Sequence, residues 1–307
     1  MNKKTILILS CMLISLAFAA GFSMAKSGNG SKAYAGMQLE VINNLQKYGV
    51  AIEDASKPQF NTNLVGFFSA PKSLTDALNK FSIVLRNDSP QQVMAMTVIW
   101  KFYPSAGQPI TQSFTQIAMD DIFNNTSHNL IGSGGLRGIS LLAQNGGFGT
   151  PTGQITEIKD DEWTQAQLAR LNTLLSHSVR WSVEIDGALL SNGLYVGLDA
   201  TSRFAFLQAK IQGARDMINE LALKAGDPGA LVGFAQEAAK VTMEDLEKKF
   251  PDVRTRMKNP EYAYAQSRRQ IALRTLAERE TNGGNTAAVD FIQAGTRNQI
   301  AIVRKTS

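Results

Sequence analysis

Cysteine and histidine are scarce in this chain. Its 307 residues contain one cysteine, Cys11, and two histidines, His128 and His177. If the segment carrying Cys11 is removed, the mature chain has no disulfide, no thiolate metal site and no cysteine nucleophile. Two histidines far apart in sequence also argue against a zinc site. We therefore expect no metal and no cofactor, and a fold held together by its apolar core alone.

Charge is missing near the N-terminus. The run from Thr5 to Ala25 has no charged residue and follows the basic pair Lys3-Lys4. This pattern is typical of an export signal, with cleavage sites at Ala17-Phe18-Ala19 and Ser23-Met24-Ala25. The run also approaches the roughly 20 residues that a membrane-spanning helix needs. We predict that residues 1–25 are a signal peptide or an N-terminal membrane anchor, and that the protein is exported to the periplasm or beyond the cell.

Sequence motifs for nucleotide binding and catalysis are absent as well. The chain has no G-x-x-x-x-G-K-[ST], no H-E-x-x-H and no G-x-S-x-G. In the glycine loop from Gly132 to Gly138, Arg137 stands where a dinucleotide motif needs its third glycine. The acids at Asp120-Asp121 and Asp160-Asp161-Glu162 are neighbours in sequence, which does not place two carboxyls across a cleft. We assign no catalytic residue.

Segments with an apolar residue at every second position lie between residues 37 and 198. Alternation over Phe81 to Arg86 and over Val179 to Asp186 predicts strands with one buried face. Val93 to Tyr103 is apolar on both faces, which predicts a central strand, and the more polar Ile110 to Ile117 predicts an edge strand. Asn192-Gly193 predicts a type I′ hairpin. We predict an antiparallel immunoglobulin-like β-sandwich over residues 37–198, without the paired cysteines of such domains.

Helical spacing dominates the rest of the chain, residues 199–307. The predicted helices cover Thr201 to Lys224, Ala230 to Lys240, a segment starting at Thr242, and Asn259 to Thr281; Ala287 to Val303 fits a helix or a short strand. Another helix is predicted within the sandwich region, from Asp160 to Leu175. The predicted fold class is therefore α+β, a sandwich followed by a C-terminal α-helical region. A Gly/Ser-rich stretch, residues 26–36, is expected to be a flexible leader.

The helical region also contains a basic patch. Its members are Lys248, Lys249, Arg254, Arg256, Lys258, Arg268, Arg269 and Arg274. The formal charge of +5 is modest, and acidic residues are interspersed among these cations, as on an ordinary solvated helix face. Export argues against a nucleic-acid partner. If the patch binds anything, we expect an acidic envelope polymer, an anionic lipid surface or an acidic protein.

Three functions fit these patterns. The first is an exported, non-enzymatic binding or structural module of the cell envelope. The second is a secreted hydrolase that uses His128 or His177 with a carboxylate in a cleft between sandwich and helices. The third is a scaffold tethered to the membrane through Thr5 to Ala25, its only membrane contact. The ligand and the oligomeric state are left open.

Overall fold

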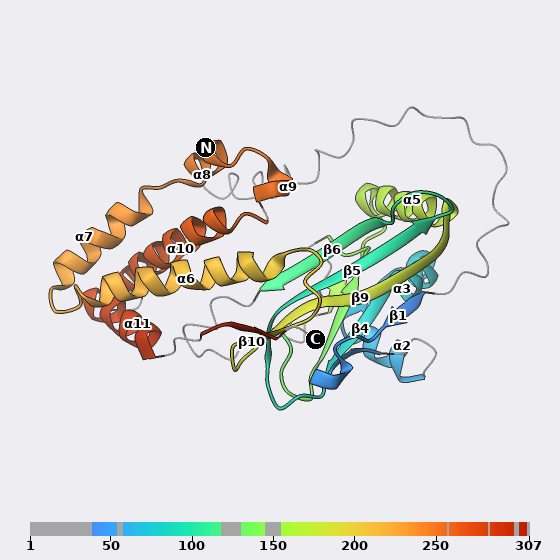
Figure 1. Cartoon of the computed structure of the whole chain (residues 1–307), viewed down its shortest axis with the longest axis horizontal. Coiled ribbons are helices and arrows are strands. Elements are labelled where there is room, and N and C mark those ends of the chain that lie inside the picture. Colours follow the sequence, from blue (N-terminus) through green and yellow to red (C-terminus); the bar gives the residue numbers. More distant parts are fainter. Residues whose placement is uncertain are drawn as a thin grey trace. The chain divides into compact units, whose positions relative to one another are not determined.

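A computed structural model describes residues 39–53, 58–117, 130–144, 155–256, 258–281, 283–297 and 301–305. All of them belong to one structural unit, residues 37–307 (Figure 1). The predicted signal or anchor, residues 1–25, and the predicted leader, residues 26–36, lie outside the described residues. Within the described ranges, no helix is both long enough and apolar enough to cross a membrane.

Two long antiparallel strands form the centre of the largest sheet. They are β5 (Val93–Pro104) and β9 (Ser178–Leu190), paired from Val93 with Leu190 to Pro104 with Ser178. The outer strands are β6 (Ile110–Ile117) on β5, and β1 (Glu40–Ile42) and β10 (Leu194–Val196) on β9, with β11 (Val303–Lys305) beside β10. The predictions of a central strand covered on both faces and of an edge strand at Ile110 to Ile117 are both confirmed.

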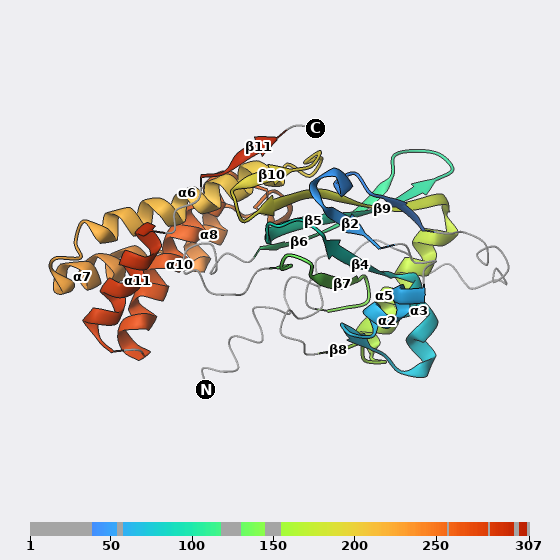
Figure 2. The same ribbon diagram turned by 90° about the horizontal axis from the view of Figure 1, so that it is seen from below.

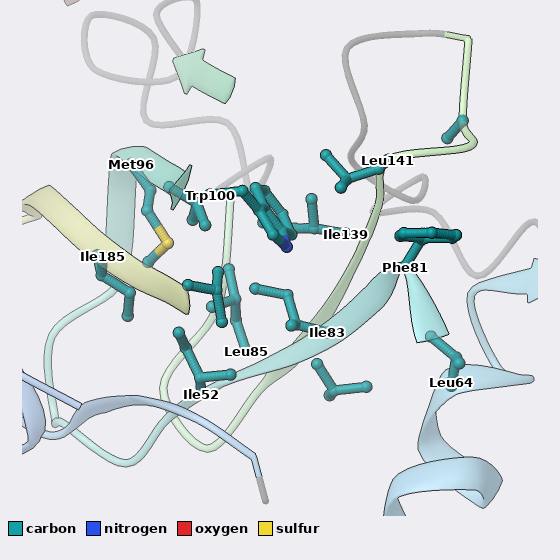
Figure 3. Close-up of a cluster of buried hydrophobic side chains, with 14 of the residues drawn as sticks. Ile52, Leu64, Phe81, Ile83, Leu85, Met96, Trp100, Ile139, Leu141 and Ile185 are labelled. Carbon is teal, nitrogen blue, oxygen red and sulfur yellow. The ribbon is translucent and has the colours of Figure 1, made fainter. Parts of the chain in front are cut away.

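A smaller sheet packs against one face of β5 and β9. It contains β2 (Val50–Ile52), β4 (Ser82–Asn87) and β7 (Leu136–Ser140), and a separate parallel pair joins β3 (Phe68–Ser69) to β8 (Thr156–Glu157). The helices of this region are α2 (Pro58–Leu64), α3 (Thr75–Lys80) and α5 (Glu162–Ser176). Figure 3 shows their shared core, in which Trp100 and Ile139 approach each other from the two sheets. Trp181 stacks on Phe102, with ring centroids 5.8 Å apart.

The remaining helices are gathered beyond the sheet (Figures 1 and 2). They are α6 (Arg203–Ala222), α7 (Pro228–Ala239), α8 (Met243–Lys249), α9 (Val253–Arg256), α10 (Pro260–Thr281) and α11 (Asn285–Arg297). Helix α6 contributes Ile211, Ala214 and Ile218 to a second core, which reaches Met94 and Leu189 of the largest sheet. The helix start predicted at Thr242 is confirmed by a capping box with Asp245, whereas α7 begins at Pro228, capped by Asp227, two residues before the predicted start at Ala230.

The prediction of an immunoglobulin-like sandwich followed by a helical region is wrong. The fold is a mixed α/β arrangement with several small sheets, and its helices are distributed along the chain. Strands β1 and β9 pair in parallel, and so do β10 and β11, so the C-terminal strand returns to the sheet that the earlier strands build. Period-two alternation identifies an extended segment but not its partner, which is why the topology was missed.

Two finer predictions about β9 and its turn are also corrected. From Trp181 onward the strand is buried on both faces, because Ser182, Glu184 and Asp186 on its polar face are almost inaccessible to solvent, whereas Val179 on the predicted buried face is exposed. The turn to β10 does form a hairpin, but it is not of type I′, since Gly193 has φ 84° and Asn192 has no positive φ. Ala287 to Val303 divides into helix α11, which ends at Arg297, and the start of β11.

Candidate functional site

A pocket of about 420 Å³ lies where β2, α2 and β4 meet. The described residues that line it form an apolar floor surrounded by polar side chains. The floor consists of Ala51, Ile52 and Phe60, which are all buried. The polar lining consists of Asn43, Gln46, Glu53, Gln59, Asn63 and Arg86.

Core packing and local hydrogen bonds position the floor of the pocket. Ile52 lies in β2, and its side chain also belongs to the main core (Figure 3). Asn43 holds the chain before the pocket in place: its amide donates to the Ile52 carbonyl at 3.1 Å and accepts from the Ile52 N–H at 2.6 Å. The first turn of α2 then presents Phe60 from the other side. The side-chain amide of Asn43 therefore pairs with both backbone groups of Ile52, as a neighbouring strand would do at this edge of β2.

The charged groups of the pocket are already engaged with neighbours. Both carboxylate oxygens of Glu53 accept hydrogen bonds from the Asn63 amide, at 3.1 and 2.9 Å. Arg86 donates through Nε to Asp88 at 2.8 Å, and both side chains are about half exposed. By contrast, the side-chain amides of Gln46 and Gln59 are exposed and make no hydrogen bond within the described part of the chain. Two neutral amides are thus available to a ligand.

The neutral side chains of the pocket lining can form hydrogen bonds with a ligand. An amide offers one acceptor and two donors, which match hydroxyl and amide groups without the desolvation cost of a charge. Among the described residues that line the pocket, Glu53 is the one acid and histidine is absent.

The sequence contains only a compositional signal for this pocket. Six amide side chains occur between residues 43 and 63: Asn43, Asn44, Gln46, Gln59, Asn61 and Asn63. Amides of this kind are common in loops, so the signal is weak without the fold. The fold makes it specific, because β2 and α2 place four of the six around one apolar floor.

The basic patch is distributed over α8 to α10 and is largely paired with acids. Five of its cations form ion pairs: Lys248 with Glu244, Lys249 with Glu261, Arg256 with Glu247, Arg268 with Glu220 and Arg274 with Glu278. Arg269 donates to the Val241 carbonyl at 2.7 Å, and Lys258 is exposed. The side chain of Arg254 is outside the described residues. The local positive field of the patch is therefore small, and its role remains a prediction.

The glycine loop before β7 is closed by a buried asparagine. The Asn87 amide donates to the carbonyls of Gln91 at 2.8 Å and Gly132 at 2.9 Å, and the Gly134 N–H donates to the Asn87 carbonyl at 2.7 Å. Gly134 has φ 70°, a conformation that favours glycine. These bonds explain the glycines as parts of a tight loop around Asn87.

The predicted acids and histidines are not brought together in the described structure. Asp161 is the N-cap of α5 and accepts from the Thr164 N–H at 2.9 Å, which lowers the pKa of its carboxyl. His177 is exposed at the C-terminal end of α5, 2.8 Å from the Thr173 carbonyl. His128, Asp120 and Asp121 lie outside the described residues. In the described ranges, no group of three or more His, Cys, Asp or Glu side chains could hold a metal ion.

A buried polar cluster joins the largest sheet to α6, and we call it the Asp199 junction. It consists of Asp186, Tyr195, Asp199, Thr201 and Arg203. Asp186 accepts from the N–H groups of Ala200 at 2.6 Å and Thr201 at 3.0 Å. Asp199 accepts from the Tyr195 hydroxyl at 3.1 Å and from the N–H groups of Arg203 at 2.6 Å and Phe204 at 2.9 Å.

The electrostatics of the Asp199 junction indicate a structural role. Burial, reinforced by the charges of Asp199 and Asp186, raises the pKa of the Tyr195 phenol. Burial lowers the pKa of Arg203, and the same carboxylates partly offset that effect. Asp199 and Ser202 both have φ 57°, an uncommon conformation for residues other than glycine. The two carboxylates bind the backbone of the turn, so they fix the start of α6 on the sheet.

Comparison with known proteins adds no family to this description. No protein-family model matches the chain, and neither the curated proteins nor the solved structures contain a significant match.

Proposed function

We propose that this chain is an exported, non-enzymatic binding module of the cell envelope, and that the pocket between β2, α2 and β4 takes up a neutral saccharide unit. The observation that carries the proposal is the pair of exposed, unengaged amides of Gln46 and Gln59 above an apolar floor. Sugar hydroxyls both donate and accept, as these amides do, and the ring C–H surface suits an apolar floor. The N-terminal sequence pattern supports export.

The charged residues near the pocket favour a neutral ligand over an anionic or a cationic one. A polyanion would need unpaired cations, but Arg86 is bonded to Asp88 and most cations of the basic patch are paired with acids. A cationic ligand would have to compete with Asn63 for Glu53. A neutral ligand avoids both costs, since burying an unpaired charge is expensive.

The test is retention on the insoluble envelope of the producing cells. The wild-type protein should co-sediment with envelope material and be released by a soluble neutral oligosaccharide, such as a β-linked glucose or N-acetylglucosamine trimer. Gln46→Ala with Gln59→Ala should weaken retention about tenfold or more, since each lost hydrogen bond is worth about 0.5–1.5 kcal/mol.

Gln208→Ala is the matched control, because Gln208 is an exposed amide on α6 that lies outside the pocket lining. It should leave retention unchanged. Equal retention of the pocket variant and the wild type would rule out the pocket as the binding site. Release by peptides but not by sugars would reject the saccharide, and turnover of ester, glycoside or peptide substrates by the purified protein would reject the non-enzymatic role.

A further inference from the structure

Strand β6 forms one edge of the largest sheet. Its eight residues pair with β5 in a regular antiparallel register, from Phe102 with Ile110 to Ala95 with Ile117. The register shifts of this sheet fall between β5 and β9, so no bulge interrupts the β5–β6 ladder. Among the described residues, β5 is the only strand that pairs with β6, and Figure 1 shows β6 outermost beside β5. One row of β6 backbone groups is therefore directed away from the sheet.

The side chains of β6 lack the devices that keep an edge strand from pairing. Charges, proline, bulges and short length all protect natural sheet edges. The sequence of β6 is Ile-Thr-Gln-Ser-Phe-Thr-Gln-Ile, with no charge, no proline and no glycine. The opposite edge, β11, is short and contains Arg304 and Lys305. The contrast within one sheet indicates that β6 is an edge built to be paired.

We propose that β6 pairs with β6 of a second copy of this chain, antiparallel and about a two-fold axis that passes through Ser113. A two-fold axis perpendicular to the sheet keeps both core faces on the same side and makes the sheet continuous across the interface. Two identical side chains meet on such an axis, and Ser113 is the smallest residue of the strand and is exposed. This inference is independent of the saccharide pocket.

The neutral chemistry of β6 favours a second copy as its partner. In this register Thr111 lies opposite Thr115 of the second copy, which is a hydroxyl pair. The same kind of pair already exists within the sheet, where the Thr97 and Thr115 hydroxyl oxygens are 3.0 Å apart. Two copies of a chain with net positive charge repel each other, which favours an uncharged contact strand such as β6 over a charged one.

Sedimentation equilibrium of the exported protein tests the proposal, with Ser113→Lys as the variant. The wild-type protein should sediment as a dimer. Two lysines facing each other on the axis should weaken the dimer at least about tenfold, the equivalent of about 1.4 kcal/mol. The control is Leu223→Lys, which adds the same charge at a side chain 88% exposed near the end of α6, and this variant should remain dimeric.

A cysteine cross-link then locates the interface. Residues directly opposite in an antiparallel pair have Cα atoms about 4.5–5.5 Å apart, within the range of about 4.4–6.8 Å that a disulfide needs. In a Cys11→Ser background, Ser113→Cys should oxidise to a covalent dimer, while Val303→Cys on the opposite edge should not. A monomeric wild-type protein, open-ended aggregates, or a dimer that survives Ser113→Lys and leaves Ser113→Cys unlinked would each overturn the proposal.

Discussion

Replacing Asp199 with alanine should destabilise the protein far more than a similar change on the surface. The Asp199 carboxylate accepts three hydrogen bonds, from Tyr195, Arg203 and Phe204, and its side chain is only 5% exposed. Alanine removes all three at once. Residue 199 has φ 57°, a left-handed conformation that aspartate tolerates better than alanine because its polar side chain can form local hydrogen bonds.

The expected loss follows from the groups left without a partner. The N-cap residue of α6, Ser202, makes no side-chain cap, so the Asp199 carboxylate takes that role, and loss of a cap costs about 0.5–2 kcal/mol. A buried hydroxyl without an acceptor costs about 1–3 kcal/mol. The free energy of unfolding should therefore fall by roughly 2–5 kcal/mol. Urea denaturation followed by circular dichroism measures this difference, provided that the slope m is unchanged.

Asp216→Ala supplies the matched control. Asp216 also lies on α6 and also accepts from a tyrosine, Tyr264, at 2.9 Å, but it is partly exposed. Water replaces the lost acceptor there, so the cost should stay near 1 kcal/mol or below. If Asp199→Ala costs no more than Asp216→Ala, the Asp199 junction does not fix α6 to the sheet and the reasoning fails.

Two further predictions concern pH and helix packing. Because the pKa of Tyr195 is raised, its contribution to stability is complete below the ordinary phenol pKa of 10.0 and is lost as pH rises above that value. The urea midpoint should therefore fall less steeply above that pH for Tyr195→Phe than for the wild type. Parallel slopes for the two proteins would contradict this. Gly213→Ala should cost about 1–3 kcal/mol, because its Cβ would lie 2.4 Å from a backbone oxygen of α10. The Cβ of Gly233→Ala would meet open space on α7, so this variant should gain up to about 1 kcal/mol of stability. Similar losses of stability in both variants would refute the packing argument.

Sequence reasoning succeeded where the signal is local. The helix starts at Thr242 and Asn259 were predicted from residues within one turn, and both caps form as expected. The burial of β5 was predicted from its own two apolar faces. In each case the residues that determine the structure are neighbours in sequence, so the pattern is sufficient.

Contacts between residues distant in sequence could not be predicted from these patterns. The polar face of β9 is typical of an exposed surface, yet Glu184 and Asp186 are buried because their partners come from elsewhere. Lys101 of β5 forms an ion pair with Glu184, and the turn after β10 donates to Asp186. A buried acid with a remote donor has the same sequence signature as a solvated acid, so alternation alone predicted one exposed face.

The proposed saccharide pocket and the proposed dimer through β6 together predict a repeating ligand. The pocket is built by β2, α2 and β4, whereas β6 belongs to the largest sheet, so neither proposal uses a residue of the other. A dimer through β6 would carry two pockets, and two linked sites bind a polymer more tightly than either binds a single unit. Ser113→Lys should then weaken retention on an envelope polymer while leaving the affinity for a short oligosaccharide unchanged. The pocket variant should weaken both, which separates a defect in pairing from a defect in recognition.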